Sequence, residues 1–518
     1  MAGMPEAFSR LHDTRALARR QERKMKNLYV MFPEELGCIV PEIYGHFAEH
    51  IGGVIYDGIW VGKDSPVENV HGLRKYLLDK LKEVAPPVMR WPGGCYAETY
   101  DWRDGIGNNR PQRLNWWTNW DQRLESNEVG THEFMDFCEQ LGTQPYFAAN
   151  ITSVTPLHIR NWVDYCNSPE GTTTLAQERA ENGHPEPFGI RYWGIGNENW
   201  GGGGNMDPTV YAHEYRRFSA LVNNIPGDKV LIACGPNADD YHWTHRFMEA
   251  MADSEKHMQG FSLHYYCGWA GDPVNFTRDQ WYQQLKQAER MDEILNRHWS
   301  IIKGYGMEEH AKLVIDEWGC WHPDGSGPSR GGNLFEQQST MRDAAVTALT
   351  LNIFNNNCEK IRMANVAQLV NNLHALFLVS GENCIVTPTY HVFHMYKNHQ
   401  GAAAVRTAVE ADMVGYLDKD GREESIPSLS VSASHKDGCA TITIANLNAE
   451  EDAHIRLKPV GRGFSADGEM TILSHSDVHA HNTFENPDCV TEKTEAIDTG
   501  GEITIPKAGI AAIRVRLL

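Results

Sequence analysis

The sequence predicts an α/β fold, a (β/α)₈ TIM barrel followed by a C-terminal antiparallel β-sandwich. Short apolar runs alternate with amphipathic helical stretches over residues 42–386, and eight such runs can be counted. Strands that alternate with helices form parallel sheets, and eight of them close a barrel. After about Thr387 the pattern changes to alternating strands separated by turns, which is typical of a sandwich. A doubly wound open sheet is the alternative, but "WPGGCY" lacks the G-x-G-x-x-G spacing of a phosphate-binding turn.

The chain begins with an Arg-rich extension, residues 1–26, to which we assign no role. It lacks the apolar stretch of a secretory signal, so we expect a solvated helix or a frayed segment, with an organelle transit peptide as the alternative. Residues 27–41 have the composition of a β segment. We expect this segment to join the C-terminal sandwich.

The barrel elements are expected over residues 42–386, and the helix at 207–224 has the clearest start. Asp207 suits its N-cap and Pro208 its first helical position. Strands are expected, in chain order, at 42–49, 87–94, 144–151, 190–198, 229–237, 260–266, 312–318 and 360–368, and the helices between them include 70–84, 131–142, 207–224 and 278–299.

Residues 387–518 are expected to form the sandwich. Segments such as 428–448 and 501–518 alternate apolar and polar residues, and no long helical pattern appears among them. We see no row of aromatic residues there that would suit a separate carbohydrate-binding module. We therefore interpret this part as a structural cover for the barrel.

Composition narrows the class of partner. The chain has 518 residues, of which 41% are hydrophobic, and no run approaches the roughly 18 apolar residues of a membrane span. A net charge of -21 argues against nucleic acid or an anionic membrane and favours a neutral substrate. Fifteen Trp and nineteen Tyr suit a carbohydrate cleft. Eleven scattered Cys without a C-x-x-C pair indicate reduced thiols, so we expect a cytoplasmic protein.

Polar side chains follow the predicted barrel strands. In such barrels the catalytic side chains come from the carboxyl ends of the strands. This many polar groups on one rim predict a polar cleft with several carboxylates. The residues at these ends are Glu49, Arg90, Asn150, Asn197, Glu198, Asn237, His264, Tyr266, Glu317 and Gln368.

Two of these residues, Glu198 and Glu317, follow the fourth and seventh strands, in "GIGNE" and "LVIDE", and are 317 − 198 = 119 residues apart. These strand ends lie across a barrel mouth from each other, so both carboxylates can face one ligand. A pair of carboxylates is the minimum for glycoside hydrolysis, provided that their environments separate their pKa values. The alternative is that each glutamate only caps a helix or pairs with an Arg.

Other chemistries have weaker support. No H-E-x-x-H or Cys/His cluster predicts a metal site, and we expect neither metal nor cofactor. We expect His46 and His50 to be hydrogen-bonded residues of the cleft. No G-x-S-x-G predicts a Ser nucleophile, and Cys95 in "RWPGGCY" fits the floor of the cleft better than a nucleophile.

Seven segments together resemble the intracellular α-L-arabinofuranosidases of glycoside hydrolase family fifty-one. The likeness extends over nearly the whole chain from about Asn27. Asn-Glu after the fourth strand with Glu after the seventh is shared by a wider clan of retaining barrel glycosidases, and the other segments narrow the resemblance to this family. The segments are "IYGHFAEHIGG", "RWPGGCYAETYDWRDGIG", "ESNEVGTHEFMDFC", "YWGIGNENWGGGGNM", "SLHYY", "IDEW" and "NVAQLVNNL".

The resemblance implies a role for each matching residue. Glu198 would be the acid/base and Glu317 the nucleophile, about 5 Å apart as in retaining enzymes. Tyr266 would orient Glu317. The remaining residues would form the sugar subsite, with Asn197 and Glu49 on sugar hydroxyls, Cys95 and Gln368 in the wall, and one of Trp116, Trp117 and Trp120 in the cleft.

The resemblance also implies a substrate, an arabinofuranose-containing oligo- or polysaccharide, and a homo-oligomer, a hexamer in this family. An endoglucanase or β-xylosidase on the same barrel remains an alternative, and a non-catalytic carbohydrate-binding protein is a further one. Linkage preference is left open. The four glycines at 201–204 predict a flexible loop that folds away from the cleft so that a bulky leaving group can approach.

Overall fold

The computed structural model describes residues 25–117, 123–254 and 257–518. Eight parallel strands form a closed barrel, which confirms the predicted fold class. In the order β10-β11-β12-β13-β2-β5-β8-β9, they span Val230–Ala233, Gly260–Gly268, Lys312–Trp321, Ile361–Val366, Gly45–Phe47, Val88–Trp91, Gln144–Ala149 and Tyr192–Ile195. Each lies within or overlaps one of the eight expected strands.

The barrel strands are apolar and almost fully buried because helices cover the outside of the barrel and side chains fill its interior. All four residues of β5, β9 and β10 are buried, as is usual in parallel sheets. The helices around the barrel are α2 (Lys75–Val84), α3 (Thr131–Leu141), α4 (Pro156–Asn167), α5 (Thr174–Glu181), α6 (Pro208–Asn223), α7 (Tyr241–Met251), α8 (Arg278–Gly304) and α9 (Met341–Asn356).

The predicted start of helix α6 is confirmed. The Asp207 side chain accepts a hydrogen bond from the Thr209 backbone N–H, and Pro208 occupies the first turn, where no backbone donor is needed. Helix α6 buries one face, including Tyr211, Tyr215 and Phe218, against the barrel. The strand β9, with Glu198 beyond its end, is therefore backed by a well-anchored helix.

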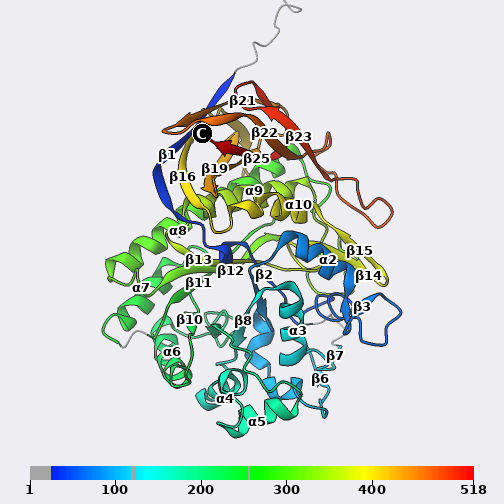
Figure 1. The fold of residues 1–518 in the computed structure, drawn as a ribbon, viewed down its shortest axis with the longest axis vertical. Helices are drawn as coiled ribbons and strands as arrows, with labels where there is room; N and C mark the ends of the chain where they lie inside the picture. Colours follow the sequence, from blue (N-terminus) through cyan, green and yellow to red (C-terminus); the bar gives the residue numbers. More distant parts are fainter. Residues whose placement is uncertain (1–24, 118–122, 255–256) are drawn as a thin grey trace, which may run out of the picture.

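A nine-stranded sheet lies above the barrel in Figure 1, and strand β1 (Lys26–Cys38) is part of it. β1 pairs antiparallel with β16 and parallel with β21, so the sheet is not wholly antiparallel. The order is β23-β22-β25-β20-β19-β16-β1-β21-β24, with β16 at Ala403–Val409, β19 at Leu429–Lys436, β20 at Cys439–Asn446, β21 at Ala453–Val460, β22 at Phe464–Leu473, β23 at Glu492–Asp498, β24 at Ile503–Ile505 and β25 at Ile510–Leu517.

Helix α10 (Pro388–Tyr396) was not among the expected elements, because no long helical pattern appears after Thr387. Eight of its nine residues are buried, so it has no polar face and no amphipathic period by which the sequence could reveal it. Together with α9, it lies between the barrel and the nine-stranded sheet (Figure 1).

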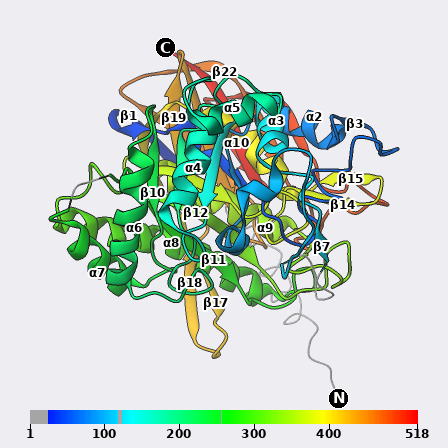
Figure 2. The ribbon, with the colours of Figure 1, turned by 90° about the horizontal axis from the view of Figure 1, so that it is seen from below.

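Small hairpins complete the fold. β6 (Arg113–Leu114) pairs with β7 (Leu124–Glu125) in the loop that follows β5. β17 (Met413–Leu417) pairs with β18 (Glu423–Pro427) in a hairpin that projects from the body of the molecule in Figure 2. Among the described residues, none of the helices is both long and apolar enough to cross a membrane.

Candidate active site

A cavity of 280 Å³ opens where the barrel strands end. Six of the seven predicted site residues line it, and the exception is Asn197. The wall is completed by apolar and aromatic side chains from loops after β2, β12 and β13. The lining residues are Glu49, Ile51, Gly94, Cys95, Trp117, Glu198, Gly202, Tyr266, Glu317, Trp321, Phe335, Gln368, Asn372 and Leu373.

Glu198 and Glu317 face each other across this cavity. Carboxylate oxygens of the two residues lie within 4.8 Å of one another. Glu198 follows β9 with a left-handed backbone (φ 43°), a conformation that is rare outside glycine and is often found at functional sites. Glu317 lies within β12 and its side chain is 8% exposed, against 19% for Glu198.

Two donors hold the Glu317 carboxylate. Arg90 Nη1 lies 2.8 Å from Oε1 and the Tyr266 hydroxyl donates to Oε2 at 2.8 Å. Arg90 is 1% exposed and comes from β5, which β13 and β2 separate from β12, the strand that carries Glu317. A buried guanidinium and a phenol therefore fix the orientation of the Glu317 side chain.

His264, from β11, lies between three carboxylates. Its Nδ1 is 2.9 Å from Glu198 Oε1 and 3.5 Å from Glu317 Oε2, and its Nε2 is 3.3 Å from Asp316 Oδ1. Burial alone would lower the pKa of His264, but the charges of Glu317 and Asp316 and the hydrogen bond to Glu198 outweigh it and raise the pKa to about 10. The imidazole is therefore protonated on both nitrogens, and positively charged, at neutral pH.

The neighbours of His264 respond to that charge. Burial would raise the pKa of Glu198, but the hydrogen bond and charge of His264 hold it below its usual value. Burial would also raise the pKa of Asp316, but Arg90 and His264 outweigh it and hold that pKa below its usual value. The sequence placed Arg90 and His264 on the rim without a role, and the geometry places both in contact with the glutamate pair.

Asn197 lies behind the cavity wall. Its Oδ1 accepts from Arg90 Nη2 at 2.6 Å, its Nδ2 is 3.9 Å from Cys95 Sγ, and its side chain is 1% exposed. Asn197 thus supports Arg90 and Cys95.

Glu49 and Gln368 form a pair on another wall. Gln368 Nε2 donates to Glu49 Oε2 at 2.9 Å, the Glu49 backbone N–H donates to Gln368 Oε1 at 3.1 Å, and the Tyr96 N–H donates to Glu49 Oε1 at 3.0 Å. Burial, followed by the charge of Glu317, raises the pKa of Glu49 to about 7. This pair therefore offers both hydrogen-bond donors and acceptors to a sugar.

Cys95 begins the short 3-10 helix η2 (Cys95–Thr99), and its thiol lies 3.5 Å from Glu198 Oε2. Burial and then the charge of Glu198 raise the pKa of this thiol well above its usual value. A thiol that resists ionisation is a poor nucleophile, so Cys95 belongs to the wall of the cavity.

The tryptophan cluster divides between two cavities. Trp117 lines the cavity that contains the two glutamates, whereas Trp116 lines a neighbouring cavity and is 63% exposed. Trp120 lies outside the described residues. Of the two tryptophans of this cluster that the structure describes, Trp117 is therefore the one that lines the sugar subsite.

The prediction that His46 and His50 are both hydrogen-bonded cleft residues is wrong for His46. Neither ring nitrogen of His46 has a hydrogen-bond partner among the described residues, and its ring packs 4.8 Å from the ring of Phe393. Burial lowers the pKa of His46 to about 3, so it is a neutral core residue. His50 bonds to Glu125 at 2.9 Å and accepts from Trp91 Nε1 at 3.0 Å.

Two other rim residues have structural partners. The Asn150 side chain bonds to Ser153 Oγ and the Tyr100 carbonyl, and the Asn237 backbone forms an isolated bridge with His264. Neither lines the cavity between the glutamates.

Glu98 belongs to the site although no role was predicted for it. Its Oε1 accepts from the Asn197 N–H at 2.6 Å, and its Oε2 accepts from the Ile151 and Thr152 N–H groups at 3.1 Å each. It is 2% exposed and joins η2 to the ends of β8 and β9. The signal for it was weak, an acid within "CYAET" that follows no predicted strand directly.

Two groups of described residues have donor atoms close enough for a metal ion, Glu198–His264–Glu317 and Cys320–His322–Asp343. In the first group, protonated His264 already lies beside both carboxylates. In the second, Asp343 Oδ1 lies 2.9 Å from His322 Nε2, and Cys320 Sγ accepts from Gln284 Nε2 at 3.4 Å. Hydrogen bonding therefore accounts for both groups.

Comparison with known proteins gives consistent matches along the chain. Two family models match, the α-L-arabinofuranosidase 1 domain over residues 80–268 and the α-L-arabinofuranosidase C-terminal domain over residues 316–508. The intracellular exo-α-L-arabinofuranosidase of Bacteroides ovatus is 38% identical over 462 residues, which cover 87% of this chain and 87% of that protein.

Solved structures agree in fold. The GH51 arabinofuranosidase from Xanthomonas axonopodis pv. citri is 36% identical, with a TM-score of 0.88 over 95% of this chain and 100% of that chain. The α-L-arabinofuranosidase from Thermotoga maritima, solved as an arabinose complex, is 29% identical, with a TM-score of 0.83 over the same shares.

Proposed function

The chain belongs to the α-L-arabinofuranosidases of glycoside hydrolase family fifty-one, and from this premise we propose how its residues act. It is a glycosidase whose substrate class is the arabinofuranosides. We propose that it releases non-reducing terminal α-L-arabinofuranosyl residues from arabinose-containing oligo- or polysaccharides by double displacement, with Glu317 as nucleophile and Glu198 as acid/base.

The observation that carries this proposal is the spacing of the two carboxylates. Their oxygens approach within 4.8 Å, which suits the separation of about 5–5.5 Å in retaining enzymes. Inverting enzymes need about 6.5–9.5 Å, so that a water molecule fits between the sugar and the base. The short gap favours direct attack by one carboxylate on the anomeric carbon.

The contacts support Glu317 as the carboxylate that attacks. Glu317 accepts hydrogen bonds from Arg90 and Tyr266, which aim its carboxyl oxygens, as a nucleophile requires. Glu198 lies opposite, next to the protonated His264. In the first step, Glu198 gives a proton to the glycosidic oxygen while a Glu317 oxygen bonds to the anomeric carbon and the bond to the leaving group breaks.

The proton that Glu198 donates has a source in His264, whose Nδ1 lies 2.9 Å from Glu198 Oε1. A sugar that displaces water from the cavity strengthens the burial effect, which raises the pKa of Glu198. Once Glu317 is esterified, its negative charge is gone, and Glu198 releases a proton more readily. Glu198 then takes a proton from a water molecule, whose oxygen attacks the anomeric carbon. The bond between that carbon and the Glu317 oxygen breaks, and arabinose leaves with retained configuration.

The remaining wall residues bind the sugar. Glu49 and Gln368 present hydroxyl-binding groups, Trp117 offers an aromatic face, and Cys95 limits the size of the ring that fits. Asn197 reaches the sugar only by exchanging its bond to Arg90, and until then it acts through Arg90 and Cys95.

The test of the activity is hydrolysis of p-nitrophenyl α-L-arabinofuranoside beside the corresponding xyloside and glucoside. We expect turnover of the arabinofuranoside to exceed that of the other two by orders of magnitude. Turnover of the xyloside or the glucoside without turnover of the arabinofuranoside would instead support the β-xylosidase or endoglucanase alternative.

Substitution of the nucleophile tests the mechanism. We expect Glu317→Ala to lower kcat by about 10⁴-fold or more, because the covalent step is lost. Azide should restore turnover by attacking the anomeric carbon in the vacated space. A Glu317→Ala variant with normal turnover would refute the assignment, and Glu359→Ala, outside the cavity, serves as the control.

We also propose that the protein acts in the cytoplasm as a homo-oligomer, a hexamer as in the family. All eleven Cys are free thiols, as is usual in a reducing compartment, and the Bacteroides ovatus relative is named intracellular. Light scattering coupled to size exclusion measures the oligomer directly, and a monomeric mass would refute that part of the proposal.

A further inference from the structure

A second cavity of 340 Å³ adjoins the active-site cavity. Both are lined by Trp117, which lies between them. The residues that line it lie at 96–104, 113–117 and 125–127, after β5 and around the β6–β7 hairpin. No step of the proposed mechanism uses it.

The same chain segments form the walls of both cavities. In η2, Cys95 faces the glutamates, whereas Tyr96 and Thr99 line the second cavity. After β6, Trp117 lines both cavities, whereas Asn115 and Trp116 line the second alone. The two cavities therefore lie side by side and share the wall that Trp117 forms.

Hydrogen bonds fix this wall relative to the catalytic residues. Asn115 Nδ2 donates to the His50 carbonyl at 2.9 Å, and the Gly52 N–H donates to the Trp117 carbonyl at 2.9 Å. The Trp117 N–H in turn donates to Asn115 Oδ1 at 2.9 Å. Because His50 directly follows Glu49, the second cavity has a fixed position beside the sugar subsite.

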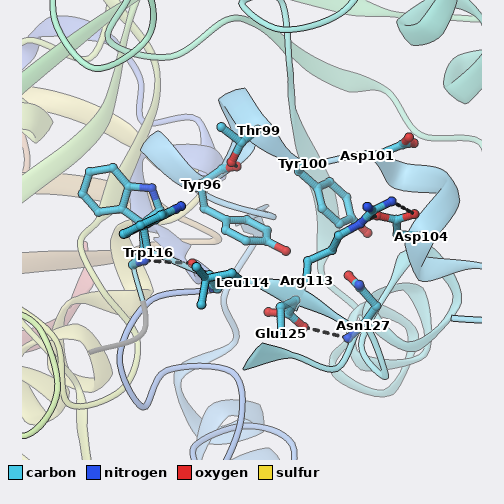
Figure 3. A pocket seen from close by; sticks show the side chains of 12 residues that line it. Tyr96, Thr99, Tyr100, Asp101, Asp104, Arg113, Leu114, Trp116, Glu125 and Asn127 are labelled. Atoms are coloured by element: carbon cyan, nitrogen blue, oxygen red, sulfur yellow. Dashed lines mark hydrogen bonds and ion pairs between the residues drawn. The ribbon is translucent and has the colours of Figure 1, made fainter. Parts of the chain in front are cut away.

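Aromatic rings give this cavity flat apolar surfaces. In the view of Figure 3, the rings of Tyr96 and Tyr100 lie between Trp116 on one side and the pair Arg113–Asp104 on the other. Trp116 is 63% exposed, an unfavourable position for so large an apolar ring unless a ligand covers it. Such rings bind the C–H face of a sugar, and the indole and phenol groups also offer hydrogen bonds.

Polar side chains around these rings suit a neutral ligand. Arg113 Nε and Nη2 bind the two oxygens of Asp104 at 2.7 and 3.1 Å, and Asn127 offers an amide. The wall carries three carboxylates, Asp101, Asp104 and Glu125, against one guanidinium, a net charge of 1 − 3 = −2. This charge favours sugar hydroxyls and disfavours uronic acids.

We propose that this second cavity binds a neutral sugar residue of the leaving glycan chain, the residue that carries the arabinofuranosyl group or its neighbour. The inference rests on the proposed function, because it assumes an arabinofuranosyl group between Glu198 and Glu317. It adds a specificity determinant, Trp116, which contacts the part of the substrate that is not cleaved.

The experiment measures kcat/KM of wild-type protein and of Trp116→Ala on two substrates. One is p-nitrophenyl α-L-arabinofuranoside, and the other is a neutral xylo-oligosaccharide that carries one α-L-arabinofuranosyl branch. We expect Trp116→Ala to lower kcat/KM for the oligosaccharide, relative to the aryl substrate, by about tenfold, chiefly through KM, since one buried aromatic contact is removed. Trp116→Phe keeps a flat ring and should recover most of the difference.

Tyr76→Ala provides a matched control. Tyr76 is 42% exposed on α2 and lines neither cavity, so the ratio should stay at the wild-type value. An unchanged ratio in Trp116→Ala would overturn the inference while leaving the aryl activity, and with it the proposed function, intact. Wild-type protein inactive on the aryl substrate would remove both. If the oligomer mass of Trp116→Ala changes while the ratio does not, Trp116 belongs to a contact between copies of the chain, and the inference is also overturned.

Discussion

Four carboxyl groups, those of Glu49, Glu198, Asp316 and Glu317, share one small volume, and two cations, Arg90 and His264, lie beside them. Glu198 is partly buried and the other three are buried. If three of the four are ionised, the charges sum to −3 + 2 = −1. A fourth ionised group would add uncompensated charge in a region of low dielectric. Burial is the first cause of the raised pKa of Glu49, which reaches about 7, and the charge of the neighbouring Glu317 is the second.

The raised pKa of Glu49 predicts a pH dependence of stability. A folded-state pKa above the unfolded value of 4.5 gives a contribution that is fully present below pH 4.5 and is lost as pH rises through about 7. Glu49→Gln mimics the neutral acid at every pH. We therefore expect the Tm of wild type, relative to that of Glu49→Gln, to fall by a few degrees between pH 5 and pH 8.5 in calorimetry at one scan rate.

The control for this measurement is Glu495→Gln, at an exposed position of β23. Its difference from wild type should hold constant over the same pH range. Parallel profiles for wild type and Glu49→Gln would show that Glu49 does not take up a proton in the folded protein.

At the scale of elements, the loop after β9 differs from the flexible segment that its four glycines predict. The Gly201 and Gly203 N–H groups donate to the Glu198 carbonyl at 2.7 and 3.1 Å. The Gly203 carbonyl accepts from Asn199 Nδ2 at 2.6 Å and from Thr152 Oγ1 at 2.7 Å. The glycines thus allow a tight turn beneath Glu198.

Gly203→Ala tests this turn. A Cβ at Gly203 would lie 1.8 Å from the Asn197 carbonyl oxygen, so the backbone that carries Glu198 must shift. We expect kcat/KM for the aryl arabinofuranoside to fall by roughly 10²-fold, because a displacement of about 1 Å suffices for such a loss. At Gly201 the nearest atom is 3.8 Å away, and Gly201→Ala should keep wild-type activity. Equal activity of the two variants would contradict the role of the turn.

Glu98 connects three elements, and its replacement should affect turnover more than binding. In Glu98→Gln an amide NH₂ replaces one acceptor oxygen and faces backbone N–H groups at the end of β8 or β9. One unsatisfied buried donor costs about 1–3 kcal/mol. We expect kcat to fall by about tenfold or more through displacement of Glu198, with a smaller change in KM, in steady-state assays. A kcat within twofold of wild type would refute this positioning role.

The barrel strands could be predicted because each is a short apolar run followed by a polar residue, as in "LVIDE". Helix α10 could not, because a helix buried on all sides has no period. Arg90 and His264 appeared on the predicted rim, but their pairing with Glu317 and Glu198 depends on the barrel closing. The neutral core position of His46 depends on packing against Phe393, 347 residues away (393 − 46).

At the scale of the whole molecule, α9 connects the barrel to the nine-stranded sheet. Nearly the whole helix is buried, and its asparagines face hydroxyl groups of β19 and β20. Asn352 Oδ1 accepts from Ser432 Oγ at 2.9 Å and from Thr443 Oγ1 at 2.8 Å. Asn355 Nδ2 donates to Ser432 Oγ at 3.0 Å, and its Oδ1 accepts from the Tyr44 hydroxyl at 3.0 Å.

This polar seam predicts how the two parts depend on each other. Asn352→Ala removes the amide oxygen that accepts hydrogen bonds from the Ser432 and Thr443 hydroxyl groups, at a cost of about 1–3 kcal/mol, so we expect calorimetry to show a lower Tm or a separate transition for the sheet. Glu495→Gln, at an exposed position of β23 in the same sheet, is the control and should keep the wild-type Tm. Aryl arabinofuranoside turnover at 25 °C should remain near wild type in both, because the seam lies away from the cavity. An Asn352→Ala variant with the wild-type Tm would show that these hydrogen bonds do not hold the sheet on the barrel.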